Sequence, residues 1–317
     1  MKDCPGLRYR ARGESQLLME DQSRNENVGR LPDFIAVGPA RTGTTWLHGA
    51  LFHRASLPKG TKETHYFDWF YDKGIDWYRA YFLDCPADRP VGEIAPTYFH
   101  KPEVRGRIAG VMPGCRIVCT LRDPVDRAYS TYRVFLREGE TRLGFEDEVM
   151  RPDSRIRESN RYAFHVRGWQ ETFGKDNVGV FFYDDLEANE QGYVDSISDF
   201  LGLPRMDLSE IRPFLVRNSV RRAPRNLLLA DWAHRLRVWL WSQRADPLVR
   251  ALDRWGVWRL IQESHKDFAP LSPEMEARMR KIFLPEVTAL EELLGRDLSA
   301  WKLPSKTNSH ERVAVSA

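Results

Sequence analysis

The sequence predicts an α/β fold, a three-layer sandwich in which a mostly parallel central sheet is flanked by helices on both faces. Short apolar runs alternate with longer segments of helical periodicity, as in a parallel sheet with crossover helices. The chain has 317 residues, of which 42% are hydrophobic, so it can bury a substantial core. Its last third is periodic at helical spacing, which predicts a mainly helical C-terminal third packed on the sheet.

Four apolar runs are expected to form the strands. They are "DFIAVG" (33–38), "RPVGEIAP" (89–96), "CRIVCTLRDP" (115–124) and "NVGVFFYDDL" (177–186). Runs of this length, bounded by Gly, Pro or charged turns, are typical of buried parallel strands. Helices are expected to start at Thr44 and just after Pro124, each directly following a strand.

Two helices are expected in the C-terminal third. The first places Leu228, Leu229, Trp232, Leu236, Trp239 and Leu240 on one face. Core packing is the main interpretation of this face, with a hydrophobic acceptor wall or a membrane-surface patch as alternatives. The second aligns Met279, Ile282, Phe283, Val287, Leu290 and Leu294, and Gly295 is expected to end it. We expect one domain over 31–303, with mobile polar tails at 1–30 and 304–317.

The composition excludes several classes of partner. A formal net charge of +3 argues against a general nucleic-acid binder. The four cysteines form no CxxC pair and no metal-ligand spacing, which favours a reducing cytoplasm and predicts no metal. No apolar run approaches the ~20 residues that span a bilayer. We therefore expect a soluble cytoplasmic protein without a transmembrane segment, and its oligomeric state stays open.

The segment "VGPARTGTTWL" (37–47) is almost a nucleotide-binding phosphate loop. Gly38 and Gly43 have the spacing of that loop, but Thr44 stands where the lysine of a triphosphate-binding loop would be. A strand that turns into a helix presents backbone N–H groups and the positive end of a helix dipole to an anion. Thr44 and Thr45 add hydroxyl donors, and Arg41 adds a planar guanidinium, so the loop suits a phosphate or a sulfate.

A second anion site is predicted in "TLRDPVDRAYSTYR" (120–133). Arg122 ends a strand, and Ser130 lies two turns into the following helix and faces back toward the same end. Arg127 and Arg133 are expected to be solvated helix charges. Two anion sites on one sheet suggest a ligand with phosphate groups on both sides of a nucleoside.

With both anion sites in place, the chain resembles the sulfotransferases that use 3′-phosphoadenosine 5′-phosphosulfate (PAPS), whose fold is P-loop-like. "GPARTGTTWL" is similar to that family's 5′-phosphosulfate loop, and "LRDPVDRAYSTY" is similar to its 3′-phosphate segment. Further similar segments are "KETHYFD" (62–68), "GEIAPTYF" (92–99), "FFYDDL" (181–186) and "LGRDLSAW" (294–301). "KETHYFD" is most like the glycosaminoglycan sulfotransferases and their bacterial relatives.

The resemblance implies that PAPS is the sulfuryl donor and assigns residues to it. The candidate donor-binding residues are Arg41, Thr42, Gly43, Thr44, Thr45, Trp46, Arg122, Ser130, Tyr183, Arg221 and Arg222. Trp46 and Tyr183 are candidates for adenine contact, and core packing is the alternative for Trp46. Arg221 and Arg222, with Arg225, are candidates for a basic lid, or for a solvated basic loop.

Sulfuryl transfer needs a base for the acceptor proton and cations for the leaving phosphate. Glu63 is the candidate base, because a short loop joins it to the first helix and the matching glutamate of glycan sulfotransferases has that role. His65 and Asp68 match further polar positions, and Lys62 is either a substrate contact or an exposed charge. Arg41 would stabilise the leaving group, so Glu63, Arg41 and His65 are the candidate catalytic residues.

One position departs from the pattern of the glycan enzymes, which commonly carry lysine where this chain has Ile94. Another cation is therefore expected to serve the reaction. Two other interpretations stay open at this stage. A P-loop kinase would need lysine at Thr44 and a carboxylate for Mg²⁺, and a non-catalytic relative would bind the nucleotide without turnover. The sequence also leaves the acceptor open: a glycan, lipid or small natural product with a hydroxyl or amine.

Overall fold

The computed structural model describes residues 29–205, 207–210, 212, 215, 222–224, 226–243, 245–257 and 263–304. Most of both predicted tails therefore lies outside the described residues, and the predicted division into one domain and two tails stays a prediction. Within the described part of the chain, no helix is both long and apolar enough to cross a membrane.

The central sheet has four parallel strands in the order β2-β1-β3-β4. These strands are β1 (Phe34–Gly38), β2 (Gly92–Ile94), β3 (Arg116–Leu121) and β4 (Val178–Phe182). Each lies inside one of the four apolar runs, so the predicted parallel sheet is confirmed. All four carboxyl ends meet at one edge, where ligands bind in open α/β sheets.

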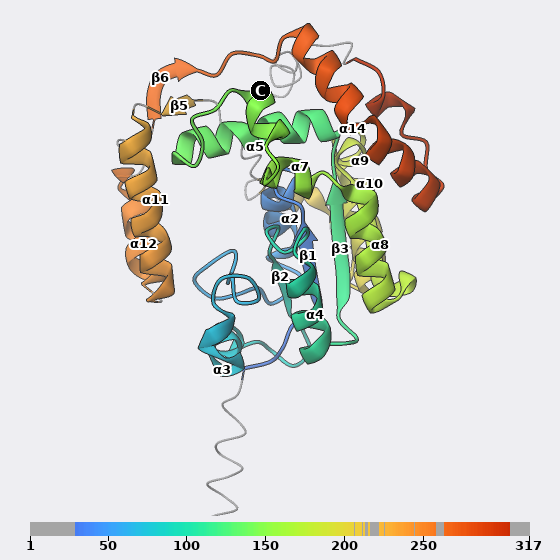
Figure 1. Cartoon of the computed structure of the whole chain (residues 1–317). Helices are drawn as coiled ribbons and strands as arrows, with labels where there is room; N and C mark the ends of the chain where they lie inside the picture. The colour runs from blue at the N-terminus through green and yellow to red at the C-terminus, as the bar shows by residue number, and fades with distance from the viewer. Residues whose placement is uncertain are drawn as a thin grey trace, which may run out of the picture.

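Helices follow the strands and continue into the C-terminal third (Figure 1). They are α2 (Thr44–Leu51), α3 (Ile75–Arg79), α4 (Pro102–Val111), α5 (Pro124–Glu138), α6 (Phe145–Met150), α7 (Arg155–Ser159), α8 (Tyr162–Phe173), α9 (Tyr183–Ala188), α10 (Glu190–Leu201), α11 (Leu227–Ser242), α12 (Asp246–Arg254) and α14 (Pro273–Leu294). The predicted start at Thr44 is confirmed, and α5 begins at Pro124 itself, next to its predicted start. The predicted end of α14 at Gly295, whose φ is 62°, is also confirmed.

Two hydrophobic cores cover the two faces of the sheet, which confirms the three-layer arrangement. On one face, side chains of β1 and β3 pack with α4, α8 and α14; Ile35, Ile117 and Trp169 are among them. On the other face, the alternate strand residues pack with α2 and α10, as Ala36 and Val118 do. This alternation is the pleat of a strand, in which successive side chains point to opposite faces.

The C-terminal third is mainly helical, as predicted, but it also contains a short antiparallel pair. This pair joins β5 (Arg222–Pro224) to β6 (Glu263–Asp267). The predicted core packing of α14 is confirmed for Met279, Phe283, Val287 and Leu290. In Figure 1, α11 and α12 stand beside the rest of the molecule, on the side of β2.

The predicted core packing of the apolar face of α11 is wrong for most of its residues. Trp232 and Trp239 are each 58% exposed, and Leu228 and Leu229 are exposed as well. Leu240 is buried as predicted, and the buried side of α11 also carries Ala230 and Ala233, which the predicted face did not include. Small alanines allow α11 to approach α5 closely, and this turns the large apolar side chains away from the helix interface.

Candidate active site

The phosphate loop is shaped by three residues with positive φ, from the last residue of β1 to the residue before α2. Gly43, the residue before the first turn of α2, has φ 87°, and Gly38 and Arg41 have φ 84° and 73°. A Cβ on Gly43 would lie 3.1 Å from the ring of Tyr183, so only glycine fits between the loop and α9. The loop therefore brings the start of α2 directly against Tyr183.

The threonines of this loop differ in role. The hydroxyl of Thr42 is fully buried, donates to the carbonyl of Pro39 at 2.6 Å, and lies 2.6 Å from the hydroxyl of Thr120. Thr42 thus fixes the loop to β3 with its side chain, and only its backbone is left to bind a ligand. Thr44 and Thr45 occupy the first turn of α2, at the positive end of the helix dipole.

The two predicted anion sites are joined in the structure. Arg41 Nε donates a hydrogen bond of 2.9 Å to Ser130 Oγ, although the two residues are 89 positions apart. Arg122 lies with its guanidinium carbon 4.7 Å from the centre of the Tyr183 ring, and it pairs with Asp126 at 3.6 Å. The structure therefore brings together Arg41, Gly43, Arg122, Ser130 and Tyr183 at the carboxyl end of the sheet.

Positive charge accumulates around Arg41. Burial, together with the neighbouring charges of Arg137, Arg122 and Arg133, lowers the pKa of Arg41 to about 10. Arg133 and Arg137 follow Ser130 along α5 by three and seven residues, which places all three on one helix face. In both arginines Nε is buried and has no hydrogen-bond partner among the described residues. Converging, partly unpaired guanidinium groups favour an anionic ligand.

The prediction that Arg127 is a solvated charge is wrong. Its side chain is 1% exposed, because it donates to Asn160 Oδ1 at 2.6 Å and Ser159 Oγ at 2.7 Å. It also donates to the carbonyl of Ala40 at 3.2 Å, inside the phosphate loop. Arg127 thus ties the loop to α7, and only the planar, five-donor guanidinium can serve these acceptors together.

A second group of polar side chains surrounds the candidate base, in the segment between α2 and α3. Glu63 Oε1 accepts from Lys62 Nζ at 3.0 Å, and Glu63 Oε2 lies 3.8 Å from His65 Nε2. The imidazole of His65 stacks on the ring of Trp69 at 4.1 Å, and its Nδ1 lies 3.5 Å from Asp68 Oδ1. The structure therefore brings together the predicted residues Lys62, Glu63, His65 and Asp68.

Electrostatics favour a charged imidazole beside a charged carboxylate. Burial acts to lower the pKa of His65, but the hydrogen bond of Asp68 and the charges of Glu63, Asp68 and Glu93 outweigh burial and raise it. Burial acts to raise the pKa of Asp68, but His65 and Lys101 outweigh it and lower it to about 2. The raised pKa makes His65 a cation that lies between the carboxyl groups of Glu63 and Asp68.

His48 of α2 is affected by the charges of both Lys62 and Glu63. It lies one turn beyond Thr44 in α2. Burial and the charge of Lys62 lower the pKa of His48 to about 4, and the charge of Glu63 opposes them. Lys62 and Glu63 are therefore near the first turns of the helix that begins at the loop. This placement agrees with the predicted proximity of Glu63 to the phosphate loop.

Sequence reasoning missed Glu93, a fully buried carboxyl group on β2 that holds this segment in place. Its Oε1 accepts from the backbone N–H of Thr64 at 2.9 Å and from the Thr64 hydroxyl at 2.6 Å, and its Oε2 accepts from Tyr78 at 2.8 Å. Thr64 lies between Glu63 and His65. A charged residue inside a short apolar strand was the available signal, because such a group is buried only with partners.

The remaining predicted residues have other surroundings. Trp46 is 2% exposed and packs edge-on against Tyr193. It is therefore a core residue, as the alternative interpretation had it, and its buried ring offers no face to a purine. Ile94 is fully buried in the same core, so the cation nearest the base comes from Lys62 instead. Arg221 and Arg225 lie outside the described residues, and of Arg222 only the backbone, in β5, is described.

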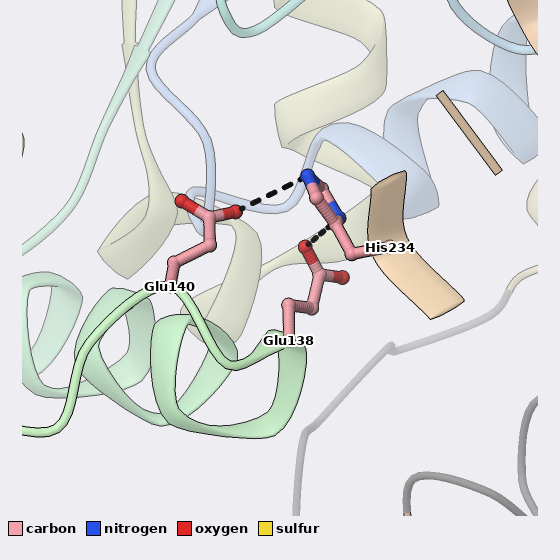
Figure 2. A group of neighbouring side chains, drawn as sticks. All are labelled: Glu138, Glu140 and His234. Carbon is pink, nitrogen blue, oxygen red and sulfur yellow. Dashed lines mark ion pairs between the residues drawn. The ribbon is translucent and has the colours of Figure 1, made fainter. Parts of the chain in front are cut away.

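A separate ionic cluster joins α11 to the end of α5. Figure 2 shows His234 of α11 between two carboxylates, with Nδ1 3.2 Å from Glu138 and Nε2 3.7 Å from Glu140. These three groups lie close enough together to ligate a metal. Arg137 and Arg237 pair with Glu138, however, and Arg155 pairs with Glu140. Three guanidinium groups already compensate the two carboxylates, so we assign the cluster to holding α11 on α5.

Comparison with known proteins shows the family of the chain. The family model described as the sulfotransferase domain matches residues 31–221, more than half of the chain. The chain therefore belongs to the sulfotransferase domain family. The phosphate loop, the segment after β3 and the candidate base all lie inside the matched region. The kinase interpretation loses its support, since Thr44 stands in place of the lysine that it requires.

Individual relatives show how far the similarity extends. The human bifunctional heparan sulfate N-deacetylase/N-sulfotransferase 3 is 29% identical over 216 residues, which cover 61% of this chain and 25% of that protein. The Drosophila melanogaster bifunctional heparan sulfate N-deacetylase/N-sulfotransferase is 26% identical over 221 residues, covering 59% and 21%. The chain thus matches only about a quarter of the length of these relatives. A sulfotransferase structure from Alicyclobacillus acidocaldarius aligns with a TM-score of 0.61 over 86% of this chain and 100% of that chain, at 21% identity, which shows a shared fold.

Proposed function

We propose that the chain transfers a sulfuryl group from PAPS to a hydroxyl or amine of an acceptor. The observation that carries this proposal is the hydrogen bond between Arg41 and Ser130, because it puts the two predicted anion sites within reach of one doubly anionic nucleotide. Family membership supports the same reaction. The scattered free thiols of Cys85, Cys115 and Cys119 support our further proposal that the chain works in the cytoplasm.

In the proposed reaction, the acceptor oxygen or nitrogen attacks sulfur in line with the bridging oxygen. The new bond to sulfur forms as the bond from sulfur to the bridging oxygen breaks, and that oxygen leaves with the 5′-phosphate of the nucleotide. Glu63 takes the acceptor proton, and Lys62 and His65 hold its carboxylate. Arg41 and the N–H groups at the start of α2 stabilise the charge that grows on the leaving phosphate.

The first acceptors to test follow from the relatives. The human and Drosophila relatives are named as N-sulfotransferases of heparan sulfate, so we propose a glycan amine as the first candidate. The experiment is incubation of the purified chain with ³⁵S-labelled PAPS and a panel of probe acceptors: N-deacetylated heparosan, a glycolipid and p-nitrophenol. Label transferred to any of them supports the proposal.

Nucleotide selectivity provides the control for this assay. Adenosine 3′,5′-bisphosphate (PAP) is expected to raise the melting temperature more than ATP with Mg²⁺ does, because only PAP carries an anion on each side of the ribose. If ATP with Mg²⁺ raised the melting temperature more than PAP does, the kinase interpretation would be favoured instead. Tight binding of PAP without transfer to any acceptor of a broad panel would favour the non-catalytic relative.

A further inference from the structure

The side chain of Lys101 reaches the candidate base through two other residues. Lys101 precedes α4, and its Nζ donates to Asp68 Oδ2 at 2.9 Å. The other oxygen of Asp68 accepts from the backbone N–H of Trp69 at 2.9 Å and faces His65 Nδ1 at 3.5 Å. His65 Nε2 in turn lies 3.8 Å from Glu63. Lys101, Asp68, His65 and Glu63 therefore form a chain of alternating charge.

Because Asp68 is buried, this row of charged side chains depends on Lys101, the residue at its exposed end. The side chain of Asp68 is 0% exposed, whereas that of Lys101 is 23% exposed. A carboxylate without contact with water depends on its partners, and the loss of one partner leaves a buried charge only partly compensated. Backbone geometry fixes the lysine as well, because Pro102 begins α4 directly after it and restricts the backbone of Lys101.

We propose that Lys101 is a positioning residue of the candidate active site, which acts through Asp68 to hold the imidazole of His65 against Glu63. This inference rests on the proposed function for its catalytic meaning. The acidic groups whose charges act on His65 are Glu63 and Asp68 from its own segment and Glu93 from β2. The hydroxyl of Thr97 also lies 3.5 Å from His65 Nδ1. Lys62 contacts Glu63 through the carboxylate oxygen that does not face His65. Lys101 is the cation that compensates the Asp68 end of this cluster.

The test compares Lys101→Met with Lys101→Arg and with Lys175→Met, which removes an exposed lysine far along the chain. The first readout is the carboxyl ¹³C signal of Asp68, assigned with Asp68→Asn, followed from pH 7 to about pH 1 so that the low midpoint of this carboxyl group is covered. Because removal of a positive charge raises the pKa of a neighbouring acid, Lys101→Met is expected to move the midpoint up by about one pH unit or more. Lys101→Arg and Lys175→Met are expected to titrate as the unchanged protein does.

The second readout is the imidazole N–H proton of His65, assigned with His65→Gln. This signal is expected to be visible in the unchanged protein and in both control variants, and to be lost to solvent exchange in Lys101→Met. PAP affinity, measured by calorimetry, is expected to stay within about twofold in all variants, which shows that the fold is intact. An unmoved Asp68 midpoint or an unchanged His65 signal in Lys101→Met overturns the proposal. Neither readout needs an acceptor, so the result of this test does not depend on whether any acceptor of the panel is sulfated.

Discussion

Arg41 and Ser130 meet in a hydrogen bond of 2.9 Å, and this contact joins the loop after β1 to the helix after β3. Ser130 accepts this bond, so its own O–H proton stays available to donate to a phosphate. A ligand that bridges the two segments would meet Arg41 and Ser130 at once. The free energy of nucleotide binding is therefore expected to depend on residues of both segments.

Arg122→Ala tests the segment after β3. The substitution removes a charge-assisted contact worth about 1.5–3 kcal/mol, which corresponds to a loss of about 10- to 150-fold in PAP affinity. Because this contact is assigned to the 3′-phosphate, the affinity for adenosine 5′-monophosphate should change much less. Calorimetry with both nucleotides checks this. An unchanged PAP affinity would discard the second anion site.

Glu63→Gln tests the base. Glutamine keeps the shape of the side chain but cannot accept the acceptor proton, so turnover is expected to fall by about 10²- to 10⁴-fold. The PAP affinity should remain within about twofold, since neither Arg41 nor Ser130 is changed. Turnover is measured with ³⁵S-labelled PAPS and the best acceptor of the panel. Sulfate transfer at the normal rate would show that another group takes the proton.

Glu93→Gln tests the support of the base from β2. The carboxyl group of Glu93 accepts hydrogen bonds from Thr64, Tyr78 and Tyr98, and glutamine offers one acceptor oxygen and one NH₂ group in its place. If the amide oxygen takes the place of Oε1, the NH₂ group faces the Tyr78 hydroxyl, which must turn to accept and loses the acceptor for its own proton. The free energy of unfolding should therefore fall by about 1–3 kcal/mol. Urea unfolding measures it, with the exposed Glu103→Gln as the matched control. Equal loss in both variants would mean that the buried network contributes nothing.

Acidification is expected to release α11 from α5. Burial acts to raise the pKa of Glu138, but His234, Arg237 and Arg137 outweigh it and hold the pKa well below its usual range. A lowered pKa in the folded state means that this stabilisation is present above the unfolded pKa of about 4.3 and is lost as the pH falls below it. Hydrogen exchange of peptides from Leu227–Ser242 should therefore accelerate from about pH 4 downward, beyond the intrinsic change.

Glu138→Gln should reproduce this release at pH 7, because it leaves Arg137 and Arg237 facing each other without their shared carboxylate. Protection of α11 is expected to fall, while peptides of β1 and β3 keep theirs. The exposed Glu292→Gln is the control. Undiminished protection of α11 in Glu138→Gln would assign its docking to the apolar contacts of Ala230, Ala233 and Leu240.

The parts of the molecule that sequence analysis predicted are those encoded locally. The four strands follow from short apolar runs, and the phosphate loop follows from the spacing of Gly38 and Gly43. The grouping of Glu63, His65 and Asp68 was also accessible, because one short segment carries all three. Period and spacing are properties of neighbours in the chain, so they survive folding unchanged.

The parts that sequence analysis missed depend on distant partners. Nothing near Arg127 in the sequence indicates that Ala40, Ser159 and Asn160 surround it, and a lone arginine on a helix is usually solvated. Glu93 is recognisable as buried only once Thr64 and Tyr78 are seen around it. For α11, the sequence showed where the large apolar side chains lie, but it did not show that the helix packs through its alanines.

The hydrogen bond from Arg127 to the carbonyl of Ala40 has a consequence for the folding reaction. Asn160 and Ser159, far downstream in the chain, hold the same guanidinium, so we expect the loop after β1 to be fixed only once those segments have docked. A half-assembled chain would therefore have no competent anion pocket. Nucleotide capture during refolding should report the last step of assembly, and a trapped intermediate with a formed sheet should leave the nucleotide free in solution.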